Sequence, residues 1–125
     1  MADFEAVHER LKAIIRDHAD GLVITKDGPA GMAIEVPGLE GKPWGYVAGT
    51  RAGKSYVSYY LMPVYATPAL ADSLSPELRK RMQGKACFNF KSVDDRLFAE
   101  LEALTAGSIP GYRAVAEQNA AQRSR

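Results

Sequence analysis

The sequence predicts an α+β domain of two layers, in which a curved antiparallel sheet of about five strands carries helices on one face. A helical pattern opens the chain, short alternating segments follow with only turn residues between them, and helical patterns return in the second half. Sequential strands joined by short turns pair antiparallel, because parallel strands need a long crossover connection. The expected order of elements is therefore α-β-β-β-β-α-β-α.

Length and composition indicate one domain over residues 1–125, with a tail from about residue 114 that we expect to fray. Hydrophobic residues make up 46% of the chain and charged residues 25%, which is typical of a globular protein. The formal net charge is +1, so no global basic field favours nucleic acid. The single cysteine cannot form an internal disulfide, and neither a signal peptide nor a membrane span is visible. We expect a cytoplasmic protein of bacterial type that binds neither nucleic acid nor membrane.

The first helix is predicted to run from Phe4 to about His18, with Asp3 as its N-cap. Apolar residues recur in this segment at three- and four-residue steps, with charged residues between them. The residues of this buried stripe are Phe4, Val7, Leu11, Ile14 and Ile15. The pattern ends before "ADG", where a turn is expected.

Four extended segments follow the first helix. "GLVITK" and "GMAIEV" flank the turn "DGPA", and alternation in the second places Met32, Ile34 and Val36 on one face. "WGYVAGT" is the third segment, in which Trp44 and Tyr46 share a face. The fourth, "KSYVSYYLMPV", is the longest and is rich in residues that fit a pleated surface.

Helix and strand alternate again in the second half of the chain. Thr67–Pro68 and Ser75–Pro76 each predict a helix start, since a hydroxyl caps a helix and proline suits its first position. Gly84 is expected to end the second of these helices, before the strand "KACFNF". The last strong helix is "SVDDRLFAELEALTAG", which ends at Gly107 and buries a stripe formed by Val93, Leu97, Leu101 and Leu104.

"GTRAGKSY", from Gly49 to Tyr56, has the composition of a phosphate-binding loop without its spacing. Three residues separate Gly49 from Gly53, one fewer than the motif G-x-x-x-x-G-K-[ST] requires. A strand pattern follows it, whereas a phosphate loop leads into a helix whose free N–H groups face the anion. We therefore predict a hairpin loop whose tip is kept soluble by Arg51 and Lys54.

Aromatic residues gather around that loop. The only tryptophan and five of the six tyrosines lie between residues 44 and 65. On the long fourth segment, alternation divides the side chains into a core face with Tyr59 and an opposite face with Tyr56 and Tyr60. An uncovered aromatic face favours a ligand or partner surface, and the alternative is a second small core under a loop or the C-terminal segment. The candidate ligand-binding residues are Trp44, Tyr46, Tyr56 and Tyr60.

Two other kinds of site compete with this one. Glu5, His8 and Glu9 form a candidate metal site on the first helix, because imidazole and carboxylate both bind transition metals. Cys87 is a candidate nucleophile, although its sequence neighbours include no histidine that would activate it. Packing or solvated roles are the competing interpretations of both sets. No nucleophile elbow is present, so we assign no catalytic residue and expect no cofactor.

"KSYVSYYLMPVY" and "LSPELRKRMQGKACFNFK", with the helix that follows, resemble the YdhG-like family of small bacterial domains of unknown function. The resemblance extends from the first helix to about Tyr112 and is most specific from Lys54 to Lys91. It implies a two-layer α+β fold with a curved antiparallel sheet and no shared catalytic motif. Some relatives are described as frataxin-like iron chaperones, which would need an acidic ridge on the first helix. Here basic residues, Arg10, Lys12 and Arg16, interleave with the acidic ones and offset their field.

We therefore expect a module that is not an enzyme and that uses its aromatic sheet face to bind a small molecule or a second copy of itself. The alternatives are an iron or metal chaperone of frataxin-like type and a small enzyme of unknown chemistry.

Overall fold

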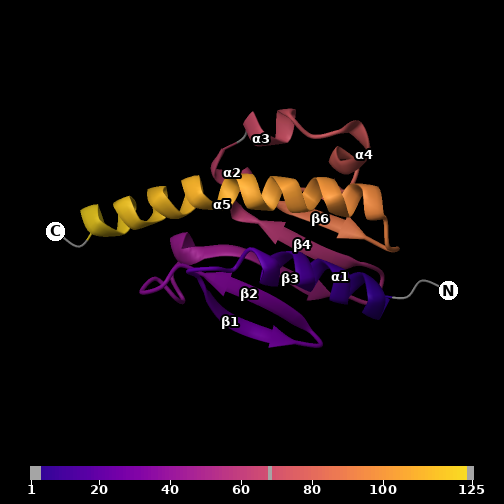
Figure 1. Cartoon of the computed structure of the whole chain (residues 1–125), viewed down its shortest axis with the longest axis horizontal. Helices are drawn as coiled ribbons and strands as arrows, with labels where there is room; N and C mark the ends of the chain where they lie inside the picture. Colours follow the sequence, from indigo (N-terminus) through magenta and orange to yellow (C-terminus); the bar gives the residue numbers. More distant parts are fainter. Residues whose placement is uncertain (1–3, 68, 124–125) are drawn as a thin grey trace.

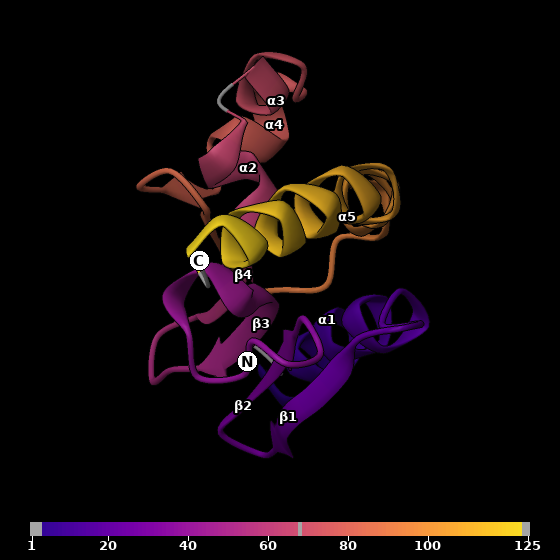
Figure 2. The same ribbon diagram turned by 90° about the vertical axis from the view of Figure 1, so that its left-hand side faces the viewer.

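The predicted α+β class is confirmed by a computed structural model, which describes residues 4–67 and 69–123. Six strands form one antiparallel sheet in the order β1-β2-β3-β4-β6-β5. The two long helices, α1 and α5, lie side by side across the same face of this sheet (Figure 1), as the view turned by 90° also shows (Figure 2). The sixth strand, beyond the five expected, is the two-residue β5.

The first three elements match their sequence patterns. Helix α1 spans Phe4–Asp17 and turns its apolar stripe towards the sheet. The next two strands, β1 (Val23–Gly28) and β2 (Gly31–Glu35), form a hairpin. Met32 and Ile34 in β2 are both buried, as alternation predicts. Asp3, the expected N-cap, lies outside the described residues.

The chain reaches β3 through a single turn of 3-10 helix, η1 (Pro43–Gly45). Strand β3 (Tyr46–Ala52) therefore begins two residues after Trp44, and the prediction that Trp44 and Tyr46 alternate on one strand is wrong. Proline explains the difference, because its fixed φ suits the first position of a helical turn.

Strand β4 (Val57–Leu61) is shorter than predicted, since helix α2 (Met62–Ala66) follows it without a loop. Pro63 lies in the first turn of α2 and has no N–H to offer a neighbouring strand. Thr67 ends α2, where its N–H donates to the Pro63 carbonyl at 2.9 Å, and the helix predicted to start here follows at Ala69. Pro68 lies outside the described residues.

Two short helices and a hairpin follow. Helix α3 covers Ala69–Asp72 and α4 covers Pro76–Arg79. Ser75 caps α4 as predicted, because its hydroxyl accepts a hydrogen bond from the Leu78 N–H at 3.2 Å. Gly84 does not end this helix; with a φ of +80° it turns the hairpin between β5 (Met82–Gln83) and β6 (Cys87–Phe90).

The last helix is longer than predicted. Helix α5 runs over Asp95–Arg123 and passes through Gly107, Pro110 and Gly111 without a break. Gly107 does not adopt the positive φ of a C-capping glycine. Ile109 and Ala116 are buried beyond it, so packing on the body of the domain outweighs weak local propensity. Leu97 and Leu101 are buried as predicted, whereas Val93 precedes the helix and is 39% exposed.

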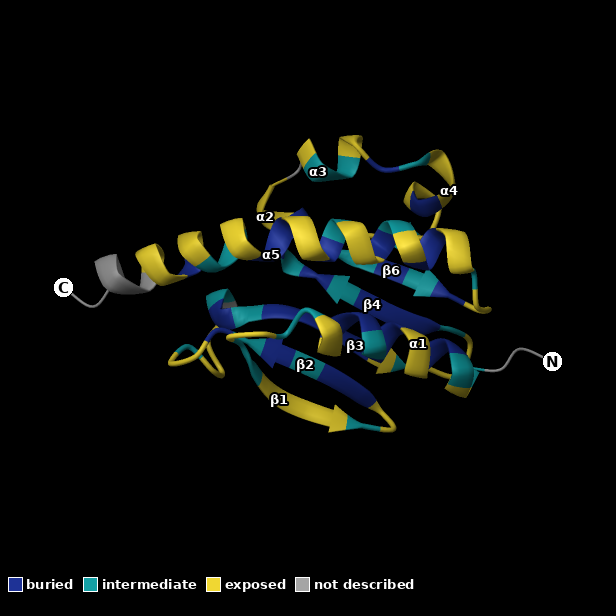
Figure 3. Ribbon diagram, viewed as in Figure 1, coloured by how far each residue is buried: buried dark blue, intermediate teal, exposed yellow. Residues whose placement is uncertain are grey.

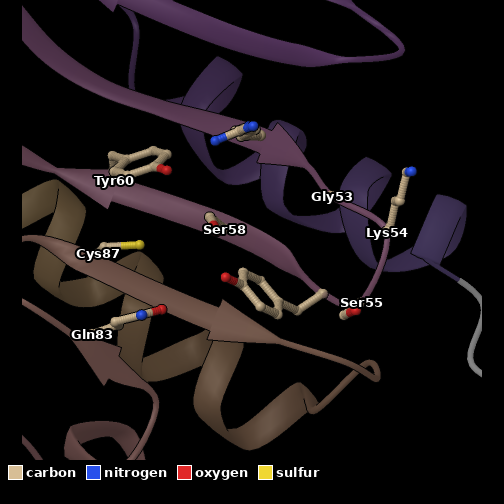
Figure 4. Close-up of a pocket in the computed structure, with 9 residues that line it drawn as sticks. Gly53, Lys54, Ser55, Ser58, Tyr60, Gln83 and Cys87 are labelled. Atoms are coloured by element: carbon tan, nitrogen blue, oxygen red, sulfur yellow. The ribbon is translucent and has the colours of Figure 1, made fainter.

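The main core lies between the sheet and its two long helices. Val57, Tyr59 and Leu61 on β4 are all fully buried on that side, which confirms the predicted core face. Figure 3 shows burial concentrated in the central strands and falling off at the edge strand β1. No helix of the described residues crosses the opposite face near the β3–β4 hairpin, and the candidate site lies there (Figure 4).

Candidate functional site

Strand pairing brings together residues that lie far apart in the sequence. Ser58 on β4 pairs with Arg51 on β3 and with Asn89 on β6, and Tyr60 pairs with Gly49 and Cys87. Paired side chains project to the same face of a sheet. The side chains of Ser58, Tyr60 and Cys87 accordingly rise from neighbouring strands on one side, with α1 behind the strands (Figure 4).

These side chains border a cavity of about 460 Å³, which is within the usual range for small-molecule sites. The β3–β4 hairpin forms one wall, β4 forms the floor, and the β5–β6 hairpin forms the other wall (Figure 4). The lining residues are Arg51, Gly53, Lys54, Ser55, Tyr56, Ser58, Tyr60, Gln83 and Cys87.

The hairpin predicted for "GTRAGKSY" forms part of this cavity, and it is not a phosphate loop. The Gly53 N–H donates to the Tyr56 carbonyl at 2.9 Å, so it closes the turn and is not free to hold an anion. Strand β4, not a helix, follows the loop.

A hydrogen-bond network centred on Asn89 fixes the far side of the cavity. The Asn89 side-chain oxygen accepts from the Ser58 hydroxyl at 2.7 Å and from the Cys87 thiol at 3.4 Å. The Asn89 amide nitrogen donates to the Gln83 side-chain oxygen at 2.6 Å. This chain of bonds orients polar groups from three strands before any ligand arrives.

Tyr46 lies beside the cavity. A Cβ atom at Gly49 would collide with the Tyr46 hydroxyl, so this glycine makes room for the ring on the open face. Burial raises the pKa of Tyr46 well above its usual range, and the nearby Tyr60 and Glu35 raise it further. The Glu35 carboxylate is already engaged, since it accepts from the Thr25 hydroxyl at 2.5 Å and from the Gly41 N–H at 2.9 Å.

The four aromatic residues predicted from the sequence are only partly brought together. Tyr56 and Tyr60 line the cavity and Tyr46 lies next to it. Trp44 does not line it; its carbonyl accepts from the Tyr112 hydroxyl of α5 at 3.3 Å, at the helix-covered side of the domain. Sequence reasoning assigned Arg51 and Lys54 only to the solubility of the hairpin tip, and it missed Gln83.

The candidate metal residues on α1 do not converge. His8 points inwards, is only 4% exposed, and its Nε2 atom lies 2.7 Å from the Thr50 hydroxyl oxygen. Burial lowers the pKa of His8, and the Lys12 charge lowers it further. Glu9 pairs with Lys12 at 3.2 Å, while Glu5 is exposed. Within residues 4–67 and 69–123, no three histidine, cysteine or acidic residues are grouped to hold a metal ion.

The surroundings of Cys87 disfavour its thiolate form. Burial raises the pKa of Cys87 above its ordinary value, and the neighbouring Ser58 and Tyr60 hydroxyls counteract only part of that rise. A nucleophilic cysteine needs the opposite shift, because the thiolate is the reactive species. The environment of Cys87 therefore favours a role as a polar lining residue over a role as a nucleophile.

Alkylation of Cys87 by iodoacetamide is expected to be slower than that of the unfolded chain at pH 7–9, because the raised pKa leaves less thiolate. The pH midpoint of the labelling rate, followed by mass spectrometry, should lie above that of the same protein in urea. Glutathione provides a reference thiol. A midpoint at or below that of the urea-unfolded chain would contradict the assignment and reopen a nucleophilic role.

A second hollow of about 480 Å³ lies on the other side of the β5–β6 hairpin, next to α2 and α3. Its lining includes Tyr65, which is 55% exposed and has the Lys85 ammonium 6.0 Å from its ring centre. Within the described residues, no hydrogen-bond network like the one around Asn89 spans this second hollow. We therefore take the cavity on β4 as the candidate site.

No family model matches this chain, and the curated proteins and solved structures also contain no match. The resemblance to YdhG-like domains stays a prediction carried by its own residues. None of the helices described is long and apolar enough to cross a membrane.

Proposed function

We propose that this protein is a binding module without catalytic activity, which holds a small molecule in the cavity on the open face of its sheet. The observation that carries the proposal is the division of β4. Its core face is fully buried at Tyr59, while Tyr60 and the adjoining Tyr56 face a cavity of ligand size. Aromatic rings offer a large contact area at little entropic cost, which suits them to hold a planar ligand.

The groups around this cavity favour binding over catalysis. Among the described residues that line it there is no histidine and no carboxylate to act as a general base. The cysteine has a raised pKa. His8 bonds to Thr50 on the opposite, helix-covered face of the sheet. What remains is a set of hydroxyl, amide and cationic side chains, which can hold a ligand but have no partner for proton transfer.

The double variant Tyr56→Ala/Tyr60→Ala tests this proposal. Fragments that shift the amide signals of residues 53–60 in wild-type NMR spectra are expected to bind the variant at least about tenfold more weakly, which corresponds to ~1.4 kcal/mol. The control is Tyr65→Ala, which removes an exposed tyrosine from the second hollow. Circular dichroism and sedimentation velocity check that fold and oligomeric state are retained.

Two results would count against the proposal. One is a fragment screen in which no compound shifts these amides. The other is a set of fragments that bind the double variant as tightly as the wild type. Loss of binding in Tyr65→Ala alone would move the site to the second hollow.

A further inference from the structure

Two cationic side chains line the cavity on the open face, and its lining includes no carboxylate. Arg51 and Lys54 both line it and are exposed. Neither side chain forms an ion pair or a hydrogen bond with any residue in the described part of the chain. The nearby carboxylate of Glu35 is bonded to Thr25 and Gly41 and is not part of the lining.

The direction of the hydrogen bonds around Asn89 also favours a negatively charged ligand. The Asn89 side-chain oxygen accepts from Ser58 and Cys87, and the Asn89 amide nitrogen donates to the Gln83 side-chain oxygen. With its oxygen occupied, Gln83 has its NH₂ group left, and no described residue accepts from it. The Ser58 hydroxyl already donates its proton to the Asn89 side-chain oxygen. The strongest groups still free to bind a ligand are therefore donors.

From this arrangement we propose that the cavity selects a small organic anion with a planar body. Its carboxylate or phosphate is bound by the Arg51 guanidinium, with Lys54 and Gln83 as further donors, and its planar part packs on Tyr60. Arginine suits this role because its planar fork matches both oxyanions. The inference rests on the proposed binding function, since it assigns a ligand class to the same cavity.

The first experiment compares probes of one shape and different charge by NMR titration of the intact protein. Benzoate, benzamide and benzamidine are nearly isosteric and carry negative, zero and positive charge, and phenyl phosphate supplies the other oxyanion. Benzoate or phenyl phosphate is expected to shift the amides of residues 51–60 in a saturable way, with benzamide at least about tenfold weaker and benzamidine weaker still. The tighter of the two anions identifies the preferred oxyanion.

The second experiment removes the charges one at a time. Arg51→Gln is expected to weaken anion binding about tenfold or more, and Lys54→Gln about two- to fivefold. Lys26→Gln is the matched control, because Lys26 is an exposed, unpaired lysine of β1 outside the cavity lining. It loses the same charge and should bind like the wild type. Raising the salt concentration should weaken anion binding and leave benzamide unaffected.

The outcomes separate this inference from the proposed function. If all three isosteres bind equally and the Tyr56→Ala/Tyr60→Ala variant loses them, the aromatic site stands and the anion inference is overturned. Anion binding that survives Arg51→Gln unchanged also overturns it. If the charged probes bind nowhere near β4 while neutral fragments do, only the anion inference fails. If no compound of any charge shifts these amides, both proposals fail.

Discussion

Replacement of Phe90 by alanine is expected to lower the free energy of unfolding by about 3–5 kcal/mol. Phe90 is 2% exposed and packs edge-to-face on Phe98 of α5, with ring centres 5.0 Å apart and ring planes at 87°. This contact joins β6 to the long helix, so its removal leaves a cavity between the two layers. Urea denaturation followed by circular dichroism measures the loss.

Phe90→Leu is the control, because it keeps most of the apolar volume and is expected to cost less than about 1.5 kcal/mol. The double variant Phe90→Ala/Phe98→Ala should cost less than the sum of the single variants, because the two rings contact each other. A loss below about 1 kcal/mol for Phe90→Ala would show that this layer contact does not hold α5 on the sheet.

Replacement of Thr105 by valine is the second change expected to have a large effect, about 1–3 kcal/mol of unfolding free energy, although it conserves shape. The Thr105 hydroxyl donates to the Leu101 carbonyl at 2.8 Å, so the Tyr59 hydroxyl, 2.7 Å away, must be the donor to Thr105. Valine would leave the Tyr59 O–H buried without an acceptor. A buried donor without an acceptor lowers the free energy of unfolding by more than the loss of a solvent-exposed hydrogen bond does.

Tyr59→Phe provides the comparison, since it removes the donor and leaves the Thr105 hydroxyl bonded to Leu101. Its expected cost is about 1 kcal/mol. The double variant Tyr59→Phe/Thr105→Val should be more stable than the sum of the single losses implies, because neither polar group is then stranded. Thermal and urea unfolding of all four proteins measure this coupling. The assignment fails if Thr105→Val proves no less stable than Tyr59→Phe.

Elements with one buried face could be predicted from the sequence. The α1 stripe and the alternation in β2 and β4 are strong because one face of each element lies in the core. For the same reason the sequence placed Tyr59 in the core and Tyr60 on the opposite face. In such elements the period of the apolar residues reports burial directly.

Elements that depend on distant contacts could not be predicted. Local signals end the last helix at Gly107, yet α5 continues because Ile109 and Ala116 pack on the rest of the domain. Trp44 follows a proline and lies in a helical turn. The alternation of only two residues, Trp44 and Tyr46, is too short to distinguish such a turn from a strand. In both places tertiary packing or backbone chemistry outweighed a weak local pattern.

Only those residues of the candidate site that lie in one segment of the sequence could be predicted. Tyr56 and Tyr60 follow from alternation within one segment. Gln83 and Cys87 reach the cavity because β6 pairs with β4 after the three short helices, and β5 folds back along β6. Such pairing between segments that are not sequential leaves no local signal. The unbalanced charge of Arg51 is likewise visible only once its neighbours are known.

The two-sided character of β4 also bears on how such a protein can diverge. Changes at positions 56 and 60 alter side chains that line the open-face cavity, and we expect them to leave the main core between the sheet and its helices intact. Changes at positions 57, 59 and 61 fall on fully buried side chains and are expected to destabilise the fold. Substitutions at alternate positions of this one stretch are therefore expected to change the open face and the stability of the domain separately.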